Sequence, residues 1–510
     1  MKMFSNEPVK LKKADRPLIL AIDIGTSSTR AVVYDAQGRS VKKLVHQVGY
    51  MMQVTPDGGV FADPKFIVDA TAQCIDAIME AMGKDANDIK AVGFDTFWHN
   101  MMGIDMRGKP TTPLINWADT RPRIVIDDLR KRIDPEEAHR LTGCVLHPSY
   151  LPAKLLWMHK YNKEDFRRTT TWMSIGEYLY YVFFGKVICG ISMASGTGLF
   201  NQNTCNWDEK ILSVLPIKPG QLGELGDLDT PLRGLKSEYA RRWPALAQIP
   251  WLPAVGDGAS SNVGTGAVKK DQLCIVMGTS GALRVMWEAK DVTIPSELWV
   301  YRVDRKRFLM GGALSDGGNL RKWMLSRLAI EGGKKSVDAA LNSTKPDAHG
   351  LTMLPFWAGE RSTGWHQNAR GMINGFNLST TREDILRVTL ESLCYRYAAI
   401  YEIFKKNQMP VKQILASGGG FVDSGALTQL AADVIGFPIT QSGEAEGSAR
   451  GAAILALESI GTIKNIDMAP VPLGKTYKPH PKDNAIYKNA RQRQQRLYDL
   501  VAKGIWEENL

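Results

Sequence analysis

The sequence predicts an α/β protein of two domains with related cores, and three observations support this fold class. The chain has 510 residues, which is enough for at least two domains that each bury a core. Apolar strand-like runs alternate with helix-like segments along its length. A strand–turn–strand pattern near the N-terminus recurs about half a chain later, which indicates duplicated domain cores rather than a solenoid.

The first copy of the pattern is residues 18–35, with the sequence LILAIDIGTSSTRAVVYD. Asp23 ends an apolar strand, and a carboxylate there is costly without a partner such as a divalent cation. Gly25 lets backbone N–H groups approach an anion, and the hydroxyls of Thr26 and Ser27 add donors. Taken alone, this tip fits an anion site and ordinary turn chemistry equally well.

The second copy lies at residues 274–286, where an apolar run again meets Gly-Thr-Ser and a strand resumes after an arginine. Gly278 and Thr279 occupy the positions of the first tip, but Val276 stands where the first copy has Asp23. If both tips hold phosphate, only the first can also recruit a metal.

Polar residues also follow strand-like runs between the two copies. One such run leads into Trp98 and His99, and residues 117–122 (WADTRP) form a polar-aromatic patch without a regular period. Residues 253–258 place Asp257 directly after a short apolar strand, between two glycines. These stretches are candidates for a substrate site.

The second half carries glycine clusters beside predicted helices. Gly317 precedes one helix, and a strand ending near residue 417 runs into three glycines before the helix 426–435. Glycines in this setting let a nucleotide lie against backbone at a helix N-terminus. The helix 446–460 is rich in small residues, which favours close packing.

Composition excludes several classes of protein. No apolar run approaches the roughly 20 residues that a membrane span requires, and the first 16 residues lack the apolar core of a secretory signal. The six cysteines form no CxxC pair, which argues against a zinc or disulfide framework and favours a reducing cytosol. The net charge of +11 is spread along the chain, so solvated faces are favoured over a nucleic-acid groove. We therefore expect a cytoplasmic protein of small-molecule substrates, with a homodimer left open.

The ordered set of motifs resembles the FGGY carbohydrate kinases over roughly residues 17–465. The motifs are DIGTSSTR, WxDxR, GDG, the GTSG loop, GER with ARG, and GGGFVDSGALTQLAADVIG. Within the family, FDTFWHNMMGID followed by INWADTRP is most similar to the gluconate kinases. The resemblance implies two ribonuclease-H-like domains of the actin, hexokinase and heat-shock ATPase superfamily, each with a mixed five-stranded sheet, flanking a catalytic cleft. The implied division is an N-terminal domain at 17–266, a nucleotide-binding domain at 273–465 and a tail at 466–510.

The resemblance also implies roles in phosphoryl transfer from ATP. Asp257 resembles the catalytic base, although an N-cap aspartate is the alternative. Asp23 resembles the residue that holds Mg²⁺, and Thr26, Ser27 and Thr279 cradle the phosphates. The implied nucleotide-binding residues are Gly25, Thr26, Ser27, Gly278, Thr279, Gly317, Gly419, Gly420 and Ser424.

Sugar recognition is expected around His99 and Trp98, with simple core packing as the alternative for both. Asp119 is a candidate for binding sugar hydroxyls, and Arg121 and Lys154 are candidates for binding a carboxylate. A surface salt bridge explains Asp119 and Arg121 equally well.

Together these features predict Mg²⁺- and ATP-dependent phosphorylation of the terminal hydroxyl of a sugar acid, D-gluconate to 6-phosphogluconate. The same chemistry on xylulose, glycerol or an erythritol-like polyol is the alternative. A nucleotide-driven switch without phosphoryl transfer is an alternative of another class.

Overall fold

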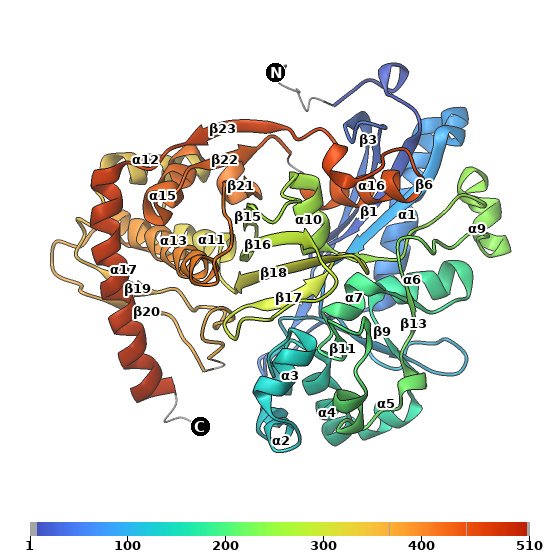
Figure 1. Ribbon diagram of the computed structural model, residues 1–510, viewed down its shortest axis with the longest axis horizontal. Coiled ribbons are helices and arrows are strands. Elements are labelled where there is room, and N and C mark those ends of the chain that lie inside the picture. Colours follow the sequence, from blue (N-terminus) through green and yellow to red (C-terminus); the bar gives the residue numbers. More distant parts are fainter. Residues whose placement is uncertain (1–7, 367, 445, 507–510) are drawn as a thin grey trace.

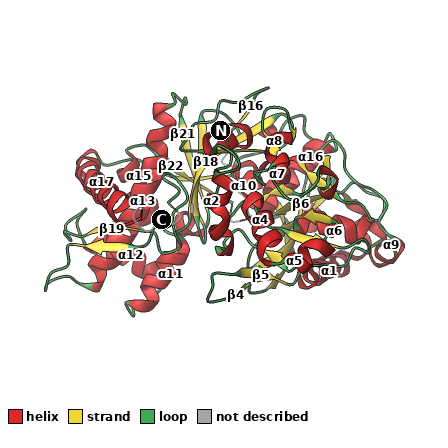
Figure 2. Ribbon diagram, turned by 90° about the horizontal axis from the view of Figure 1, so that it is seen from below, coloured by secondary structure: helices red, strands yellow, loops and turns green. Residues whose placement is uncertain are grey.

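The computed structural model describes residues 8–366, 368–444 and 446–506, and it has two lobes (Figure 1, Figure 2). Each lobe is built around one large mixed sheet. Residues 1–7 at the N-terminus lie outside the described part of the chain, and so do residues 507–510 at the end of the predicted tail.

The N-terminal sheet has the first predicted hairpin at its centre, in the order β14-β6-β1-β2-β3. β1 is antiparallel to β2 and parallel to β6, so that Asp23 lies opposite Arg30 on one side and Asp95 on the other. The apolar run of β1 is completely buried because helices cover both faces of this sheet. Its strands are β1 (Leu18–Ile24), β2 (Ser28–Tyr34), β3 (Ser40–Gly49), β6 (Ile89–Thr96) and β14 (Val255–Gly256).

Three helices cover this sheet, and one of them comes from the far end of the chain. α1 (Pro64–Met82) packs on β2 and β3, whereas α10 (Asp257–Thr265) and α16 (Gly447–Ser459) pack on the other side with β6 and β1. A Cβ on Gly264 would overlap the carbonyl oxygen of Gly447, so glycine is required where α10 and α16 meet. The small residues predicted to allow close packing of α16 do so against the N-terminal lobe.

Residues 50–250 add a mostly helical region to this lobe, with its own apolar cluster under α4. Its helices are α2 (Ile126–Arg130), α3 (Pro135–Thr142), α4 (Leu151–Tyr161), α5 (Lys163–Arg168), α6 (Ile175–Phe184), α7 (Ile191–Ser195), α8 (Glu209–Ser213) and α9 (Ser237–Arg242). Its short strands are β4 (Gln53–Val54), β5 (Val60–Ala62), β7 (Met102–Ile104), β8 (Leu114–Ile115), β9 (Thr171–Met173), β10 (Ile188–Gly190), β11 (Phe200–Asn201), β12 (Asn206–Trp207) and β13 (Glu224–Gly226).

The C-terminal sheet repeats the N-terminal topology and extends it. The order β18-β16-β15-β21-β22 matches β3-β2-β1-β6-β14 strand for strand, with the same parallel and antiparallel pairs, which confirms the predicted duplication. The expectation of five strands is wrong for this lobe, because β17 and β23 add an antiparallel strand at each edge and make a 7-stranded sheet. The strands are β15 (Gln272–Met277), β16 (Gly281–Glu288), β17 (Trp299–Arg302), β18 (Arg307–Leu314), β21 (Gln413–Ser417), β22 (Ile439–Ser442) and β23 (Leu473–Tyr477).

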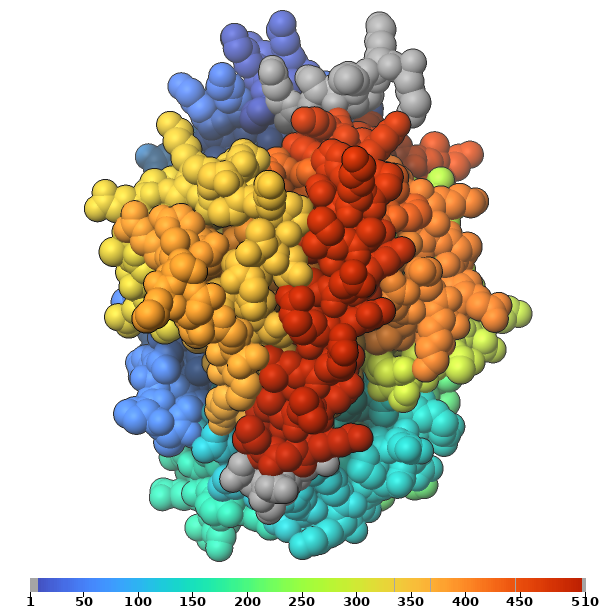
Figure 3. Space-filling view, turned by 90° about the vertical axis from the view of Figure 1, so that its left-hand side faces the viewer, coloured from blue at the N-terminus to red at the C-terminus, as the bar shows by residue number. Residues whose placement is uncertain are grey.

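Residues of the predicted tail are part of this lobe. β23 pairs with β22, and α17 (Pro481–Val501) contacts α15 and runs along the surface shown in Figure 3. The other helices and strands of the lobe are α11 (Gly318–Arg327), α12 (Lys334–Ser343), α13 (Arg382–Lys406), α14 (Gly419–Val422), α15 (Gly425–Ile435), β19 (Thr352–Leu354) and β20 (Met372–Asn374). Among the described residues, no helix is both long enough and apolar enough to cross a membrane. The division of the chain into domains at 17–266 and 273–465 and a tail at 466–510 stays a prediction.

Candidate active site

A cavity of about 350 Å³ lies at the tips of the two predicted hairpins, with a wall contributed by both halves of the chain. A wider, open hollow of about 520 Å³ around Lys269 and Lys412 contains none of the predicted site residues. The predicted residues that line the cavity are Asp23, Gly25, Thr26, Ser27, Trp98, His99, Asp257, Gly278 and Thr279. Those that do not line it are Asp119, Arg121, Lys154, Gly317, Gly419, Gly420 and Ser424.

The two hairpin tips have similar but not identical backbone turns, because the hydrogen bond that closes the second spans one residue fewer than that of the first. The N–H of Gly25 donates to the carbonyl of Ser28 at 2.9 Å, and the N–H of Gly278 donates to the carbonyl of Ser280 at 3.0 Å. Gly25 to Ser27 and Gly278 to Ser280 all line the cavity. Two facing turns of small hydroxyl residues can surround a chain of phosphates with N–H and O–H donors.

Gly317 and the triple-glycine turn lie behind the second tip. A Cβ on Gly317 would be 2.9 Å from the carbonyl carbon of Ser280, and one on Gly420 would be 2.7 Å from the Met277 side chain. Ser424 caps α15, because its hydroxyl accepts from the N–H of Leu427 at 3.1 Å, and it also donates to Asp338. Ser424 therefore has a structural role, and nucleotide contact by Gly317, Gly419, Gly420 and Ser424 stays a prediction.

Three carboxylates meet at the ends of neighbouring parallel strands. Asp23 ends β1, Asp257 follows β14, and Asp95 lies on β6, the strand between them. Asp95 is completely buried, and neither of its oxygens receives a hydrogen bond from a donor among the described residues. The two carboxyls of Asp23 and Asp95 can hydrogen-bond each other only by sharing a proton.

Burial dominates the electrostatics of this group. It raises the pKa of Asp257 to about 6, although the nearby Arg284 and the N–H of Gly258 oppose the shift. Burial also raises the pKa of Asp95 well above its usual value, and the charges of Asp23 and Asp257 add to the effect. A carboxylate with a pKa near 6 is ionised at neutral pH and still basic enough to accept a proton.

Asp95 was missed from the sequence. It belongs to the run GFDT, which lacks the glycine and hydroxyl pattern that drew attention to Asp23. The available signal was a carboxylate at the end of an apolar strand, as in Asp23 and Asp257. Its importance depends on β6 lying between β1 and β14, which local sequence does not reveal.

Trp98 and His99 form one wall of the cavity. The indole N–H of Trp98 donates to the carbonyl of Ser192 at 2.9 Å, and a Cβ on Gly256 would overlap its ring. His99 Nδ1 lies 2.6 Å from the carbonyl of Gly196, and because a carbonyl only accepts, Nδ1 carries the proton. Burial lowers the pKa of His99 to about 3, so its Nε2 is an acceptor in the neutral ring.

Asp119, Arg121 and Lys154 have partners within the protein. Arg121 forms two parallel hydrogen bonds to Asp119, at 3.0 and 2.6 Å, and Asp119 is completely buried rather than on the surface. Lys154 donates to the backbone carbonyl of His99, and burial lowers its pKa to about 7. The structure therefore does not bring these side chains to the cavity, where the sequence placed a carboxylate-binding cation.

Arg361, which sequence reasoning did not single out, places a cation at the cavity. It lines the cavity with its guanidinium 4.9 Å from the ring centroid of Trp117. Its Nη2 donates to the carbonyl of Leu314 at 2.7 Å, whereas its buried Nε has no partner among the described residues. Nearby, the hydroxyls of Tyr150 and Tyr301 are 2.7 Å apart. Arg361 belongs to the GER motif, which the sequence analysis noted. Nothing in the neighbouring sequence indicated that its Nε would be left without a partner among the described residues.

Comparison with known proteins assigns the family. The models of the N-terminal and C-terminal domains of the FGGY family of carbohydrate kinases match residues 18–264 and 273–459. The chain belongs to this family. It is therefore a phosphotransferase that acts on a carbohydrate, with the two-domain actin- and hexokinase-like fold of these ATP-dependent kinases.

Similar proteins act on more than one sugar. A gluconokinase from Bacillus subtilis is 27% identical over 478 residues, covering 92% of each chain. The gluconate kinase of Lactobacillus acidophilus has a TM-score of 0.88 at 27% identity, covering 97% of this chain and 99% of that one. A ligand-bound xylulose kinase from the same organism also has a TM-score of 0.88 at 27% identity, covering 97% and 100%. These similarities support a sugar or sugar-acid substrate without deciding which.

Proposed function

We propose that this FGGY kinase transfers the γ-phosphoryl group of ATP to the terminal hydroxyl of D-gluconate and forms 6-phosphogluconate. The observation that carries the sugar-acid substrate is Arg361, a cation in the cavity wall whose Nε has no partner in the described part of the chain. A planar guanidinium can pair with a carboxylate through two parallel hydrogen bonds. The gluconokinase of Bacillus subtilis and the gluconate kinase of Lactobacillus acidophilus are consistent with this choice.

Asp257 is the proposed base. Its carboxylate accepts the proton of the attacking hydroxyl as that oxygen bonds to the γ-phosphorus and the bond to the β-phosphate oxygen breaks. The N–H of Gly258 donates to Asp257 Oδ1 at 2.7 Å, which fixes the orientation of the carboxylate in the cavity. The large apolar ring of Trp98 lies beside it, against Gly256 and Gly258.

The two hairpin tips are the proposed phosphate cradle, with Thr26, Ser27 and Thr279 as hydroxyl donors. Asp23 lines the cavity beside the first tip and suits a divalent cation, since carboxylate oxygens are the ligands that Mg²⁺ prefers. When bound, Mg²⁺ screens the charge of the phosphates. The second tip has Val276 in place of the aspartate, so a metal is expected only at the first.

His99 and its neighbours are the proposed binding site for the polyol chain. With Nδ1 protonated, His99 Nε2 accepts a hydrogen bond, and the hydroxyl of Tyr301 is 3.5 Å from it. A substrate hydroxyl can replace this long contact. Tyr150 and Tyr301 add two further hydroxyls that donate and accept.

A substrate panel tests the proposal directly. Phosphorylation of gluconate, xylulose, glycerol and erythritol is measured through ADP release, and kcat/KM is expected to be highest for gluconate. Arg361→Gln should raise the KM for gluconate at least about tenfold, because a buried charge pair is lost, and should leave the KM of neutral sugars nearly unchanged. A wild-type enzyme that prefers a neutral sugar would overturn the gluconate assignment.

Arg370→Gln is a matched control, because this exposed arginine lies in the same segment and away from the cavity. It should keep the wild-type KM for gluconate. ATP turnover that no sugar, polyol or sugar acid stimulates would instead support the nucleotide-driven switch. The proposed homodimer is tested separately by light scattering.

A further inference from the structure

Asp95 is the polar side chain whose surroundings the proposed function leaves unexplained. It lies on the central strand of three whose ends carry carboxylates, with Asp23 directly opposite it on β1. It is 0% exposed, and both of its oxygens lack a hydrogen-bond donor among the described residues. Buried polar groups without partners are rare in folded proteins, so this one points to a group that binds there.

The charges around Asp95 are unbalanced. Asp23 and Asp257 are the carboxylates beside it, and Arg30 and Arg284 are the nearby cations. Arg30 forms an ion pair with Glu446 at the start of α16. Arg284 lies against Gly258 and therefore faces Asp257. A cation between Asp23 and Asp95 would correct this excess of negative charge.

We propose that Asp23 and Asp95 together form a divalent-cation site, in which Asp95 is the deeper ligand behind Asp23. Two strands side by side hold the carboxylates at the spacing of a parallel pair, and Asp23 is open to the cavity while Asp95 is not. One or two carboxylates are the usual protein ligands of Mg²⁺, so we expect this pair to bind Mg²⁺ or Mn²⁺ in the nucleotide-free protein. This inference does not depend on which sugar is phosphorylated.

Two other groups of metal-binding residue types occur among the described residues, and both are satisfied by the protein. In the group of Asp347, His349 and Glu391, His349 Nε2 donates to Glu391 and Nδ1 accepts from the N–H of Leu351, so no ring nitrogen is free. The second group, Asp433, His480 and Asp483, is partly exposed. Asp433 accepts hydrogen bonds from the backbone N–H of His480 and from Gln429.

Binding of Mn²⁺ to the nucleotide-free protein tests the site. The free Mn²⁺ signal in electron paramagnetic resonance is followed during titration, and the wild type is expected to bind one ion per chain. Asp95→Asn should weaken this binding at least about tenfold, the scale of effect seen when a group supporting a metal is lost. His480→Ala is the control, because it disrupts the exposed group and should leave the titration unchanged.

Thermal unfolding gives a second readout that does not use activity. Mn²⁺ should raise the Tm of the wild type, and this increase should disappear in Asp95→Asn. If that variant does not fold, Asp95→Ser removes the carboxylate with a smaller side chain. Failure of the nucleotide-free wild type to bind Mn²⁺ at millimolar concentration would overturn the inference, as would wild-type affinity in either variant. Both results are independent of the substrate panel, so they are distinguishable from failure of the proposed function.

Discussion

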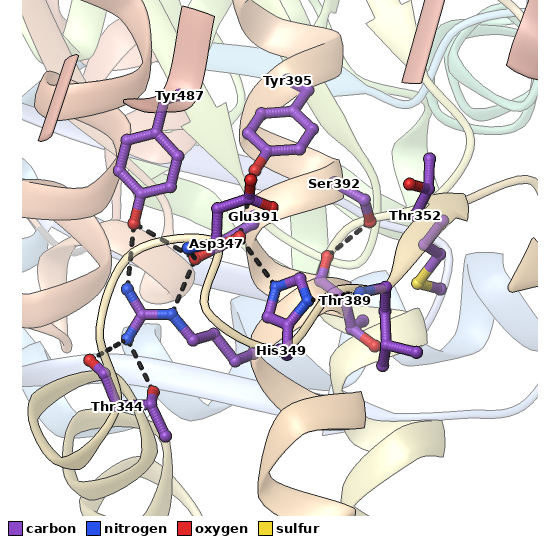
Figure 4. Close-up of polar contacts among 12 residues, drawn as sticks. Thr344, Asp347, His349, Thr352, Thr389, Glu391, Ser392, Tyr395 and Tyr487 are labelled. Atoms are coloured by element: carbon purple, nitrogen blue, oxygen red, sulfur yellow. Dashed lines mark hydrogen bonds and ion pairs between the residues drawn. The ribbon is translucent and has the colours of Figure 1, made fainter. Parts of the chain in front are cut away.

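Two groups of buried carboxylates in this chain are held in opposite ways. Behind the cavity wall, Asp95 has no donor to either oxygen among the described residues. On α13, Glu391 is equally buried but receives hydrogen bonds from His349, Arg387, Tyr395 and Tyr487 (Figure 4). The same kind of side chain is therefore satisfied in one place and unsatisfied in the other.

The pKa values of these carboxyls move in opposite directions. Burial raises the pKa of Asp95 and Asp257, and no set of donors compensates. Burial acts in the same direction on Glu391, but the hydrogen bond from His349 and the charge of Arg387 outweigh it and lower the pKa. A network that is complete in this way holds α12, α13 and α17 together, because Arg387 also donates to Leu341 and Thr344.

The presence or absence of hydrogen-bond donors distinguishes a carboxylate that stabilises the fold from one that is available to a ligand. A fully paired buried charge stabilises its own surroundings and has no capacity left for a ligand. An unpaired one is a cost to folding that the protein retains where a substrate, metal or proton completes it. Variants at the two groups should therefore change different measurements.

The largest effect is expected at Asp257. Asp257→Asn keeps the shape of the side chain but removes the base, so kcat should fall by about 10²–10⁴-fold. Nucleotide affinity, measured by calorimetry, should stay within a few-fold of the wild type. A kcat close to the wild-type value would show that Asp257 is not the base.

The next largest effect is expected at Glu391 and concerns stability. Glu391→Gln leaves Arg387 buried without its counter-charge, which should lower the free energy of unfolding by about 3 kcal/mol or more. Urea denaturation measures this loss. At temperatures where the variant is folded, kcat/KM should equal the wild-type value, and a selective loss of activity would contradict the structural role.

A smaller effect on kcat/KM and on the free energy of unfolding is expected when the pH is changed. Because the pKa of Asp257 is about 6, the base is protonated below that pH, and kcat/KM should fall about tenfold for each pH unit below 6.

The raised pKa of Asp257 also means that the native state binds more protons than the unfolded chain between about pH 4 and 6. The contribution of Asp257 to the free energy of unfolding should therefore decrease as pH rises through this range. Asp257→Asn should remove that contribution, and an unchanged pH dependence would argue against the assignment.

The smallest effect is expected for an exposed carboxylate. Asp128 pairs with Lys160 at the surface, where water and salt screen the interaction. Asp128→Asn should leave both the denaturation midpoint and kcat/KM unchanged within error. A clear loss of either would mean that burial is not what distinguishes the two groups.

Much of the fold and part of the site could be predicted from the sequence. The strand and turn pattern of 18–35 and its repeat are local, so they identified Asp23, the two hairpin tips at the cavity and the duplication. Asp257 was found because glycines flank it after an apolar run. Arg121 and Lys154 do not line the cavity, because Arg121 pairs with its near neighbour Asp119 and Lys154 donates to the distant backbone carbonyl of His99. Their role in substrate binding stays a prediction.

The sequence by itself therefore determined the elements and the chemistry at their ends, because periodicity and turn residues act over a few neighbouring positions. The tertiary structure alone decided which charged groups are paired. Asp95 became significant because β6 lies between β1 and β14, and Arg361 because its segment brings to the cavity a guanidinium whose Nε has no partner among the described residues. Some pairs are local, as in Asp119 with Arg121, but whether a buried group is left without a partner depends on contacts between residues far apart in the chain, which no local pattern encodes.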